Sequence, residues 1–427
     1  ATAVDAVEVV PRLLGADEAR RYLVAFTTPA ETRGLGGFMG NWIEFTAIEG
    51  RVRVSDSGRT KALNDGGDGP RTVSGPQDWL DVWGVYGFDN GPGGTTGQVP
   101  WSNITVSPQF PSTGRVMAEL YPQSGGEPVD GVFAVDPYVL QAFLGFTGPI
   151  SVEGVELRLT AENVADFLLV DQYRIDGPER LDLLEEVSRT AFAELLVAGL
   201  PGPTEVARVL GPLTDEGRLV GWAADEQEQA FFDSVGLSGA LPPLEGGDGL
   251  AVVLNNAGAN KLDVYLERSV SYESVVDEST GEVTATATVR LANGAPSAGL
   301  PDGVIGNYTG DDPGTNRVLV SLYSALPVRA ARVSGPGDLD EPFSVDIGAE
   351  AGWTVGSAFF AIPPGDDITI VYELQGVLPL PDGYRVTTRP QPMVIDEMLT
   401  VSSVSTTGRS LVEFEGFSTV PGVVGLR

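Results

Sequence analysis

Hydrophobic and polar residues follow two different patterns along this chain, and the pattern changes near Lys261. Before that point, short apolar runs such as residues 22–27 and 131–135 predict strands, and they alternate with stretches of helical periodicity. This alternation predicts an α/β (α+β) domain in which helices flank a mixed sheet. The clearest predicted helix spans residues 178–198, where apolar residues recur at helical spacing: Leu181, Leu184, Val187, Ala191 and Leu195.

After Lys261 the chain predicts only short strands separated by turn signals. Within residues 283–291, Val, Ala and Leu alternate with Thr and Arg, which is typical of a sheet with one buried and one wet face. We therefore expect an α/β domain at 1–255, a linker at 256–261 and an immunoglobulin-like β-sandwich at 262–427. The expected strands of the sandwich are 262–272, 283–291, 318–323, 330–333, 358–362, 368–374 and 384–389.

Local signals place further elements in the first domain. Residues 42–48 and 51–54 predict a hairpin that turns at Glu49-Gly50. Ser112 is the expected N-cap of a helix, and so is Thr160 of another. The remaining expected helices are 137–144, 203–211 and 224–235.

Charge limits the kind of partner this protein can have. The formal net charge is −33 and the pI is about 4.1, so the protein repels nucleic acid and anionic membrane surfaces. A hydrophobic content of 42% with a mean hydropathy of +0.04 indicates a folded, soluble protein. Of the 26 basic residues only Lys61 and Lys261 are lysines, a bias that fits codon usage in a GC-rich genome.

The chain contains neither histidine nor cysteine, which excludes several classes of chemistry. Ser-His-Asp and Cys-His catalysis cannot occur, and neither imidazole nor thiolate can bind zinc. Carboxylates, arginines, hydroxyls, backbone amides and a hard oxygen-bound cation remain. No apolar run is long enough to span a membrane, and the sequence starts at Ala1 without a signal-like segment. We expect a processed or trimmed product that has lost an upstream membrane anchor.

The first candidate site lies in residues 22–40, where a strand runs into a turn carrying Glu31 and Arg33. Gly34, Gly36, Gly37 and Gly40 follow, and such a run allows the main chain to approach another group closely. The strand thus delivers a charged pair to a glycine-rich turn, as an anion site requires. The glycines could equally serve only to shape a tight crossover.

Three other places carry candidate chemistry. Asn103 lies on the polar face of the extended segment 101–111, just before a helix N-terminus that attracts anions. Asp130 and Asp136 bracket a buried strand, where each could bind a cation or act as a cap or turn residue.

Arg174 and Arg180 precede and open the long helix. A cation at a helix N-terminus opposes the helix dipole, so Arg180 is expected to face an anion or to pair with Asp176 or Glu179.

These motifs together resemble domain-of-unknown-function family 4012, a group of bacterial envelope proteins frequent in actinobacteria. The match extends over nearly the whole chain. The resemblance implies an extracellular or cell-surface location, anchored to the membrane in the full-length form. It rests on the strings YLVAFTTPAETRGLGGF, SPQFP, VDGVFAVDP, FTGPISV and AGANKLDVY.

A more distant similarity is to the LytR–CpsA–Psr phosphotransferases, which move a glycan from a polyprenyl pyrophosphate carrier to the cell wall. That similarity implies that Arg33, Arg174 and Arg180 hold pyrophosphate oxygens and that Asp130 or Asp136 holds Mg²⁺. Glu31 would then activate the acceptor.

The chain departs from the phosphotransferase pattern at two places. Residues 27–29 are Thr-Thr-Pro where the enzymes carry an acidic turn, and Gln109 replaces the Asp of a Pro-Asp-Phe-Pro motif. Both changes remove a carboxylate where a metal would bind, so the fold is expected to persist while the activity is altered or lost.

Three functions therefore remain open. The protein is a phosphotransferase, a binder of a lipid-linked glycan or cell-wall polymer, or a non-catalytic structural, adhesion or assembly subunit of the cell surface.

Overall fold

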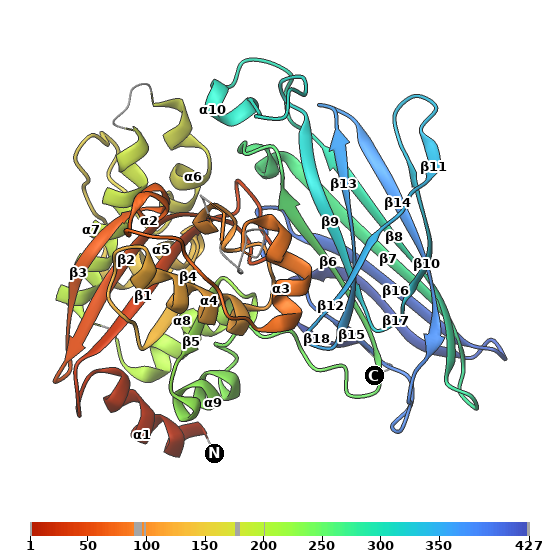
Figure 1. Ribbon diagram of the computed structural model, residues 1–427, viewed down its shortest axis with the longest axis horizontal. Helices are drawn as coiled ribbons and strands as arrows, with labels where there is room; N and C mark the ends of the chain where they lie inside the picture. Colours follow the sequence, from red (N-terminus) through yellow and green to blue (C-terminus); the bar gives the residue numbers. More distant parts are fainter. Residues whose placement is uncertain (1, 89–95, 98–99, 176–179, 200, 425–427) are drawn as a thin grey trace. The chain divides into compact units, whose positions relative to one another are not determined.

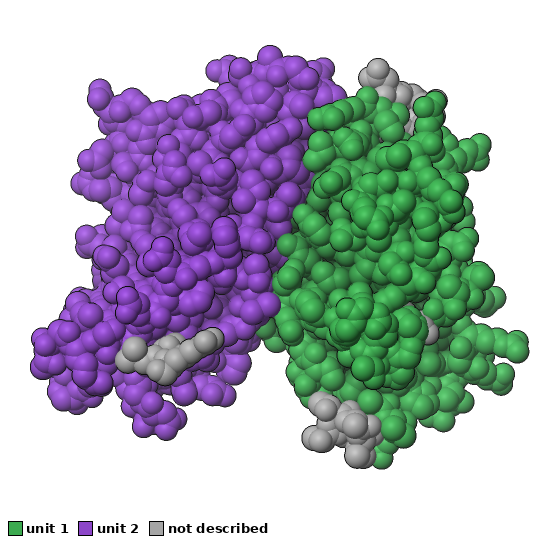
Figure 2. All heavy atoms as spheres, turned by 180° about the vertical axis from the view of Figure 1, so that it is seen from behind, with its two compact units in different colours: residues 1–29, 35–240 green, residues 30–34, 241–427 purple. Residues whose placement is uncertain are grey.

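The computed structural model describes residues 2–88, 96–97, 100–175, 180–199 and 201–424. The chain forms two compact units, of which the first holds residues 1–29 and 35–240 and the second holds residues 30–34 and 241–427 (Figure 2). No helix within the described residues is long and apolar enough to cross a membrane.

The first unit is the expected mixture of strands and helices (Figure 1). Its elements in chain order are α1 (Thr2–Leu13), β1 (Arg20–Thr28), β2 (Phe38–Ile48), β3 (Arg51–Arg59), α2 (Thr60–Asp65), α3 (Gln77–Trp83), η1 (Gly84–Tyr86), η2 (Pro100–Asn103), α4 (Phe110–Gln123), β4 (Gly131–Val135), α5 (Pro137–Thr147), α6 (Val164–Leu169), η3 (Asp171–Arg174), α7 (Arg180–Ala198), α8 (Pro203–Asp215), β5 (Leu219–Ala223) and α9 (Glu226–Ser234).

The strands of this unit form a five-stranded mixed sheet with the order β3-β2-β1-β4-β5. Only β1 and β4 run parallel, and every other neighbouring pair is antiparallel. One face of the sheet packs against α5, α6 and α7 in a continuous apolar core. On the other face α4 packs on β4 and β5, and Gly114 makes this close approach possible because a Cβ there would lie 2.5 Å from the Cβ of Trp222.

Two helix starts differ from the sequence expectation. Helix α4 begins at Phe110 with Gln109 as its N-cap, so Ser112 lies buried inside the helix and does not cap it. Pro111 fits the first helical turn, where its missing N–H has no partner to lose. Helix α6 takes Asn163 as its N-cap instead of Thr160, whose hydroxyl accepts a bond from the Glu162 N–H outside the helix.

The second unit consists almost entirely of strands. Its elements are β6 (Asp248–Asn256), η4 (Leu262–Tyr265), β7 (Leu266–Asp277), β8 (Glu282–Asn293), α10 (Asp302–Ile305), β9 (Asn316–Ser324), β10 (Val328–Ser334), β11 (Asp340–Pro342), β12 (Asp346–Glu350), β13 (Trp353–Ile362), β14 (Asp367–Val377), β15 (Val386–Thr388), β16 (Glu397–Ser405), β17 (Ser410–Ser418) and β18 (Gly422–Val424).

These strands form a β-sandwich, as the alternating sequence pattern predicts. One sheet has the order β11-β10-β14-β8-β7-β16-β17 and the other β12-β13-β9-β6-β15-β18. The inward residues of both sheets share one apolar core, and the apolar residues of β8 from Val283 to Leu291 all point into it. The predicted combination of an α/β unit followed by a sandwich is thereby confirmed.

The boundary between the units lies after Ala240, earlier than the expected linker at 256–261. The reason is β6, a strand that the sequence analysis did not separate from the first domain. It pairs with β9 and β15 at the centre of the six-stranded sheet, and all nine of its residues are buried. A strand buried on both faces reads as a continuous apolar run, so its sequence lacks the alternation that marked the other strands.

A buried carboxyl group lies at the start of β6. Asp248 is fully buried, and its side chain accepts hydrogen bonds from the Gly249 N–H at 2.8 Å and from the hydroxyls of Tyr272 and Tyr384. No basic side chain pairs with it among the described residues. Burial raises the pKa of Asp248, and the hydrogen bonds offset only part of that shift.

Replacing a core residue of β6 tests its place in the sandwich. Leu254 is fully buried in the shared core, so Leu254→Ala is expected to lower the free energy of unfolding by about 2–5 kcal/mol. Val377→Ala on β14 is the control, because Val377 is 71% exposed and its loss should change stability by less than about 0.5 kcal/mol. Denaturant unfolding measures both, and equal effects would contradict the assignment of β6 to the core.

The raised pKa of Asp248 predicts how stability changes with pH. Below the ordinary pKa of about 3.9 the group is protonated in both states; above it, the unfolded chain ionises first and stability falls until the folded pKa is passed. Asp248→Asn abolishes this loss. The free energy of unfolding of the variant relative to the native protein should therefore rise with pH above about 4, by up to about 1.4 kcal/mol per pH unit. Parallel curves for the two proteins would show that Asp248 does not titrate in this way.

Candidate functional site

The segment Ala30–Gly34, which carries the first predicted site, belongs to the second unit. Its backbone is bonded to β6 and the residues that follow it. The Thr32 carbonyl accepts from the Asn256 N–H at 2.8 Å, and the Gly34 N–H donates to the Asn255 side chain at 2.9 Å. The Gln391 side chain donates to the Arg33 carbonyl at 2.6 Å. These bonds build the segment into the sandwich as a fixed part of its structure.

The Glu31 side chain lies between two cations inside this unit. It is 4% exposed, and one carboxylate oxygen accepts from Arg33 Nη2 at 2.9 Å while the other contacts Lys261 Nζ. Burial alone would raise the pKa of Glu31, but the charges of Lys261 and Arg33 outweigh burial and lower it. Glu31 is therefore a carboxylate held in its charged form by two neighbours.

A second carboxyl group completes the arrangement. Asp263 is 1% exposed and accepts hydrogen bonds from the Thr32 N–H at 2.7 Å and from the side chains of Asn256 and Asn316. Burial raises the pKa of Asp263, and the nearby charge of Glu31 raises it further. We call Glu31, Arg33, Asn256, Lys261 and Asp263 the Glu31 cluster.

The geometry gives Arg33 internal partners. Besides Glu31, its guanidinium donates to the backbone carbonyls of Asn256 at 2.6 Å and Thr32 at 3.1 Å, and the side chain is 7% exposed. An arginine that already bonds a carboxylate and two carbonyls has few N–H groups left for a pyrophosphate. The predicted catalytic and anion-binding pair Glu31–Arg33 is thus a buried ion pair of the sandwich unit.

Asn103 also serves the structure of its own region. Its side-chain amide donates to the Tyr86 carbonyl at 2.9 Å, which ties η2 to the end of η1. The residue lies several positions before α4, whose first residue is Phe110. The predicted placement of Asn103 beside a helix N-terminus starting at Ser112 is therefore not what the structure has.

Asp130 and Asp136 do not fit a shared magnesium site. They stand at opposite ends of the five-residue strand β4, so their Cα atoms are about 20 Å apart at roughly 3.3 Å per residue. Each carboxylate is also used internally. Asp130 accepts from the Arg21 N–H at 2.8 Å and from the Arg20 guanidinium, and Asp136 pairs with Arg218 at 2.8 Å.

Asp136 has the role of a helix cap. It is 5% exposed and accepts from the N–H groups of Tyr138 and Val139 at the start of α5. Burial raises the pKa of Asp136, while Arg218 and the two N–H groups oppose the shift. Among the described residues no group of three or more acidic side chains could hold a metal ion.

The two other predicted arginines belong to the first unit. Arg174 pairs with Asp171 at 3.2 Å, three residues earlier, and its side chain is 64% exposed. Arg180 is the first residue of α7, and its side chain, like its candidate partners Asp176 and Glu179, lies outside the described residues. Arg33 and Arg174 therefore lie in different units, each beside a nearby carboxylate.

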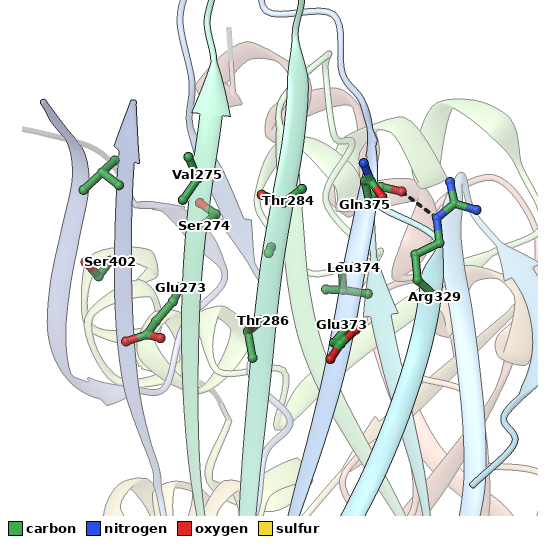
Figure 3. A pocket seen from close by; sticks show the side chains of 12 residues that line it. Glu273, Ser274, Val275, Thr284, Thr286, Arg329, Glu373, Leu374, Gln375 and Ser402 are labelled. Carbon is green, nitrogen blue, oxygen red and sulfur yellow. Dashed lines mark hydrogen bonds between the residues drawn. The ribbon is translucent and has the colours of Figure 1, made fainter. Parts of the chain in front are cut away.

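The sandwich carries a hollow that the sequence analysis did not predict (Figure 3). It has a volume of about 540 Å³ and lies on the outer face of the seven-stranded sheet, over β7, β8, β14 and β16. Glu273 and Glu373 flank Thr286, because the strand register pairs both of them with that residue. The full lining is Glu273, Ser274, Val275, Thr284, Ala285, Thr286, Arg329, Glu373, Leu374, Gln375, Ser402 and Val404.

Polar groups on the walls of this hollow are available to a ligand. Glu273 and Glu373 are exposed, and within the described part of the chain neither carboxylate forms a hydrogen bond or an ion pair. Arg329 stands at the rim, where its Nε donates to the Gln375 carbonyl at 3.2 Å. The alternation of β7 and β14 shows that both glutamates face outward, but only the sheet order brings them to either side of β8.

A second hollow, of about 600 Å³, lies in the first unit between α4, α9 and the end of β5. Its walls carry Arg115 together with Glu119, Glu226 and Asp233. None of the site residues expected from the sequence lines either hollow.

Comparison with known proteins gives one family match. Residues 17–173 match the model of the family described as a protein of unknown function, DUF4012. This segment includes Glu31, Arg33, Asn103 and both aspartates. No curated protein matches the chain.

Three solved structures have weak likeness to parts of the chain. A putative nutrient binding protein from Legionella pneumophila is 8% identical, with 36% of this chain and 54% of that chain covered and a TM-score of 0.23. The transcriptional regulator yvhJ from Bacillus subtilis is 11% identical over 51% of this chain and 76% of that chain, with a TM-score of 0.21. An M1 zinc metallopeptidase from Deinococcus radiodurans is 9% identical over 38% of each chain, with a TM-score of 0.19. The aligned region thus spans about half the length of the Legionella protein, and likenesses this weak assign no function.

Removing Asp263 tests the structural importance of the Glu31 cluster. Asp263→Ala removes a buried acceptor from three donors, of which Asn256 Nδ2 keeps a second bond to Asn260, so the free energy of unfolding is expected to fall by about 3 kcal/mol. Asp171→Ala is the matched control, since it breaks only the exposed pair with Arg174 and should cost less than about 1 kcal/mol. Denaturant unfolding of both variants gives the comparison. A loss below about 1 kcal/mol for Asp263→Ala would contradict the role assigned to this carboxyl group.

Proposed function

We propose that this protein is a non-catalytic component of the bacterial cell envelope that holds a neutral glycan, such as a cell-wall polymer, in the hollow of its β-sandwich. The single observation that carries the proposal is a pair of carboxylates, Glu273 and Glu373, that lie on either side of Thr286 and have no side-chain partner among the residues described. The envelope location rests on the resemblance of residues 22–38 and on the family match over residues 17–173.

The chemistry of the hollow favours a polyol. Sugar hydroxyls donate hydrogen bonds to carboxylates. They can also donate to, or accept from, the hydroxyls of residues that line the hollow: Thr284, Thr286 and Ser402. Its volume falls within the range of small-ligand sites, about 300–1,000 Å³. The strands that form its floor are paired along their length, which positions the groups before a ligand arrives.

The charge of the hollow speaks against the pyrophosphate end of a lipid-linked glycan. Two carboxylates point out from the hollow, and Arg329 is the one cation among its described lining residues, on a chain whose formal net charge is −33. The two carboxylates would repel a pyrophosphate placed in the hollow. The glycan portion therefore fits better than the carrier portion.

The alternative of a phosphotransferase receives less support. It requires Arg33, Arg174 and Arg180 around one anion, but Arg33 is bonded within the sandwich unit and Arg174 pairs with Asp171 in the other unit. Asp130 or Asp136 would have to hold Mg²⁺, but the two lie at opposite ends of β4 and each already bonds an arginine, which gives little support to a metal site at either. A purely structural or assembly role would leave the hollow without a ligand, which the following experiment decides.

The test is a titration of the native protein with chitotetraose, a neutral oligosaccharide, and separately with inorganic pyrophosphate. We expect saturable binding of the sugar and none of pyrophosphate. The double variant Glu273→Gln and Glu373→Gln should bind the sugar at least about tenfold more weakly, a loss of about 1.4 kcal/mol. Chemical-shift changes or calorimetry report the affinity.

The matched control is Glu267→Gln, which changes another exposed glutamate on β7 outside the hollow. It should bind the sugar as the native protein does. If the native protein binds no neutral oligosaccharide, or if the double variant binds as well as the control, the hollow is not a glycan site. Binding of pyrophosphate in preference to sugar would restore the transferase alternative.

A further inference from the structure

The Glu31 cluster contains one of only two lysines in a chain of 24 arginines. The other, Lys61, is an exposed residue paired with Asp65 in α2. Lys261 is different because its side chain is 16% exposed and its amine contacts the buried carboxyl group of Glu31. Arginine serves as a charge partner elsewhere in this protein, for example at Asp136, whereas only lysine has an amine that can act as a nucleophile.

We propose that Lys261 and Glu31 become joined by an amide bond between Lys261 Nζ and Glu31 Cδ. The bond would connect the segment Ala30–Gly34 covalently to the start of η4, 230 residues further along the chain. This inference goes beyond the proposed function and holds whether or not the hollow binds a glycan.

The reaction is a condensation that needs no oxidant and no further reactant. A proton moves from the Lys261 ammonium to a carboxylate, and the neutral amine attacks Glu31 Cδ. In the resulting tetrahedral intermediate, the Glu31 oxygen that contacted Lys261 leaves as water. The two protons of this water come from the Lys261 nitrogen, and the new C–N bond remains. The first step works against the charges of Lys261 and Arg33, which keep Glu31 ionised, but burial reduces its cost because a low-dielectric site disfavours separate charges.

The other residues of the cluster supply what the reaction needs. Arg33 Nη2 lies 2.9 Å from the second oxygen of Glu31, the one that carries negative charge in the intermediate and becomes the amide carbonyl. Asp263 bonds the Thr32 N–H next to Glu31, and its raised pKa suits a group that takes up and returns a proton. The fold holds amine and carboxyl in contact, which replaces a collision in solution by an intramolecular step.

The amide also leaves a balanced set of charges. Joining Lys261 to Glu31 removes one cation and one anion, and the cluster then retains the guanidinium of Arg33 and the carboxyl group of Asp263. A covalent link across so long a loop restricts the unfolded chain, as a disulfide does in proteins that have cysteine. This chain has none.

Intact mass under denaturing conditions tests the proposal on the native protein. We expect a mass lower than that of the sequence by one water molecule. Digestion with trypsin should then yield residues 22–33 joined to residues 219–268, with no cleavage at Lys261, because these are the stretches between cleavable basic residues. Fragmentation of that peptide locates the bond at Glu31 and Lys261.

Lys261→Arg keeps the charge but cannot form the amide, so this variant should have the full mass. Lys61→Arg is the matched control and should still lack one water molecule. A native protein of full mass, with separate peptides for residues 22–33 and 219–261, would overturn the proposal and leave an ion pair in place. So would a loss of water that persists in Lys261→Arg.

Discussion

The neutralisation of Glu31 is the constraint on which the organisation of this protein depends. A carboxylate that is 4% exposed is tolerated only with compensating charges, and here they come from Arg33, two residues away, and from Lys261, 230 residues away. Because Thr32 and Gly34 are bonded to β6 and its neighbours, the strand that begins in the first unit ends in a segment that belongs to the second. The two units are therefore interleaved in sequence while each has its own core.

The sandwich separates its polar groups into two sets with different consequences. Polar side chains inside it, such as Asp248, Gln391 and Arg268, are held by defined hydrogen bonds and fix the arrangement of β6 against its neighbours. Two glutamates on the outer face of the seven-stranded sheet, Glu273 and Glu373, have no side-chain partner within the described part of the chain, whereas Arg290 on the same face pairs with Asp367. The buried set stabilises the sandwich, and the two exposed glutamates are the groups proposed to bind a ligand.

The placement of the basic residues supports the hypothesis that the acidic hollow binds a glycan. Arginines next to the predicted anion site and the predicted metal site are used in internal pairs, as with Arg33 and Glu31 or Arg218 and Asp136. What remains exposed on the hollow is mostly acidic or hydroxylated, with Arg329 at its rim. This charge distribution supports the proposal that the hollow favours neutral polyols over anions, since carboxylates and hydroxyls both bond sugar hydroxyls.

The sequence by itself determined the local pattern and the class of each unit. The alternation in residues 283–291 was enough to predict a sandwich strand, and the periodicity of residues 178–198 predicted α7 to within two residues, because both signals depend only on which faces are buried. It also singled out Glu31 and Arg33 as a candidate site, and the family resemblance included the string that contains Lys261. Only the tertiary structure decided that these residues meet, that β6 belongs to the sandwich and that Glu273 and Glu373 lie on either side of Thr286. Such facts depend on strand order and long-range contacts, which bring together residues whose separation in sequence carries no local signal.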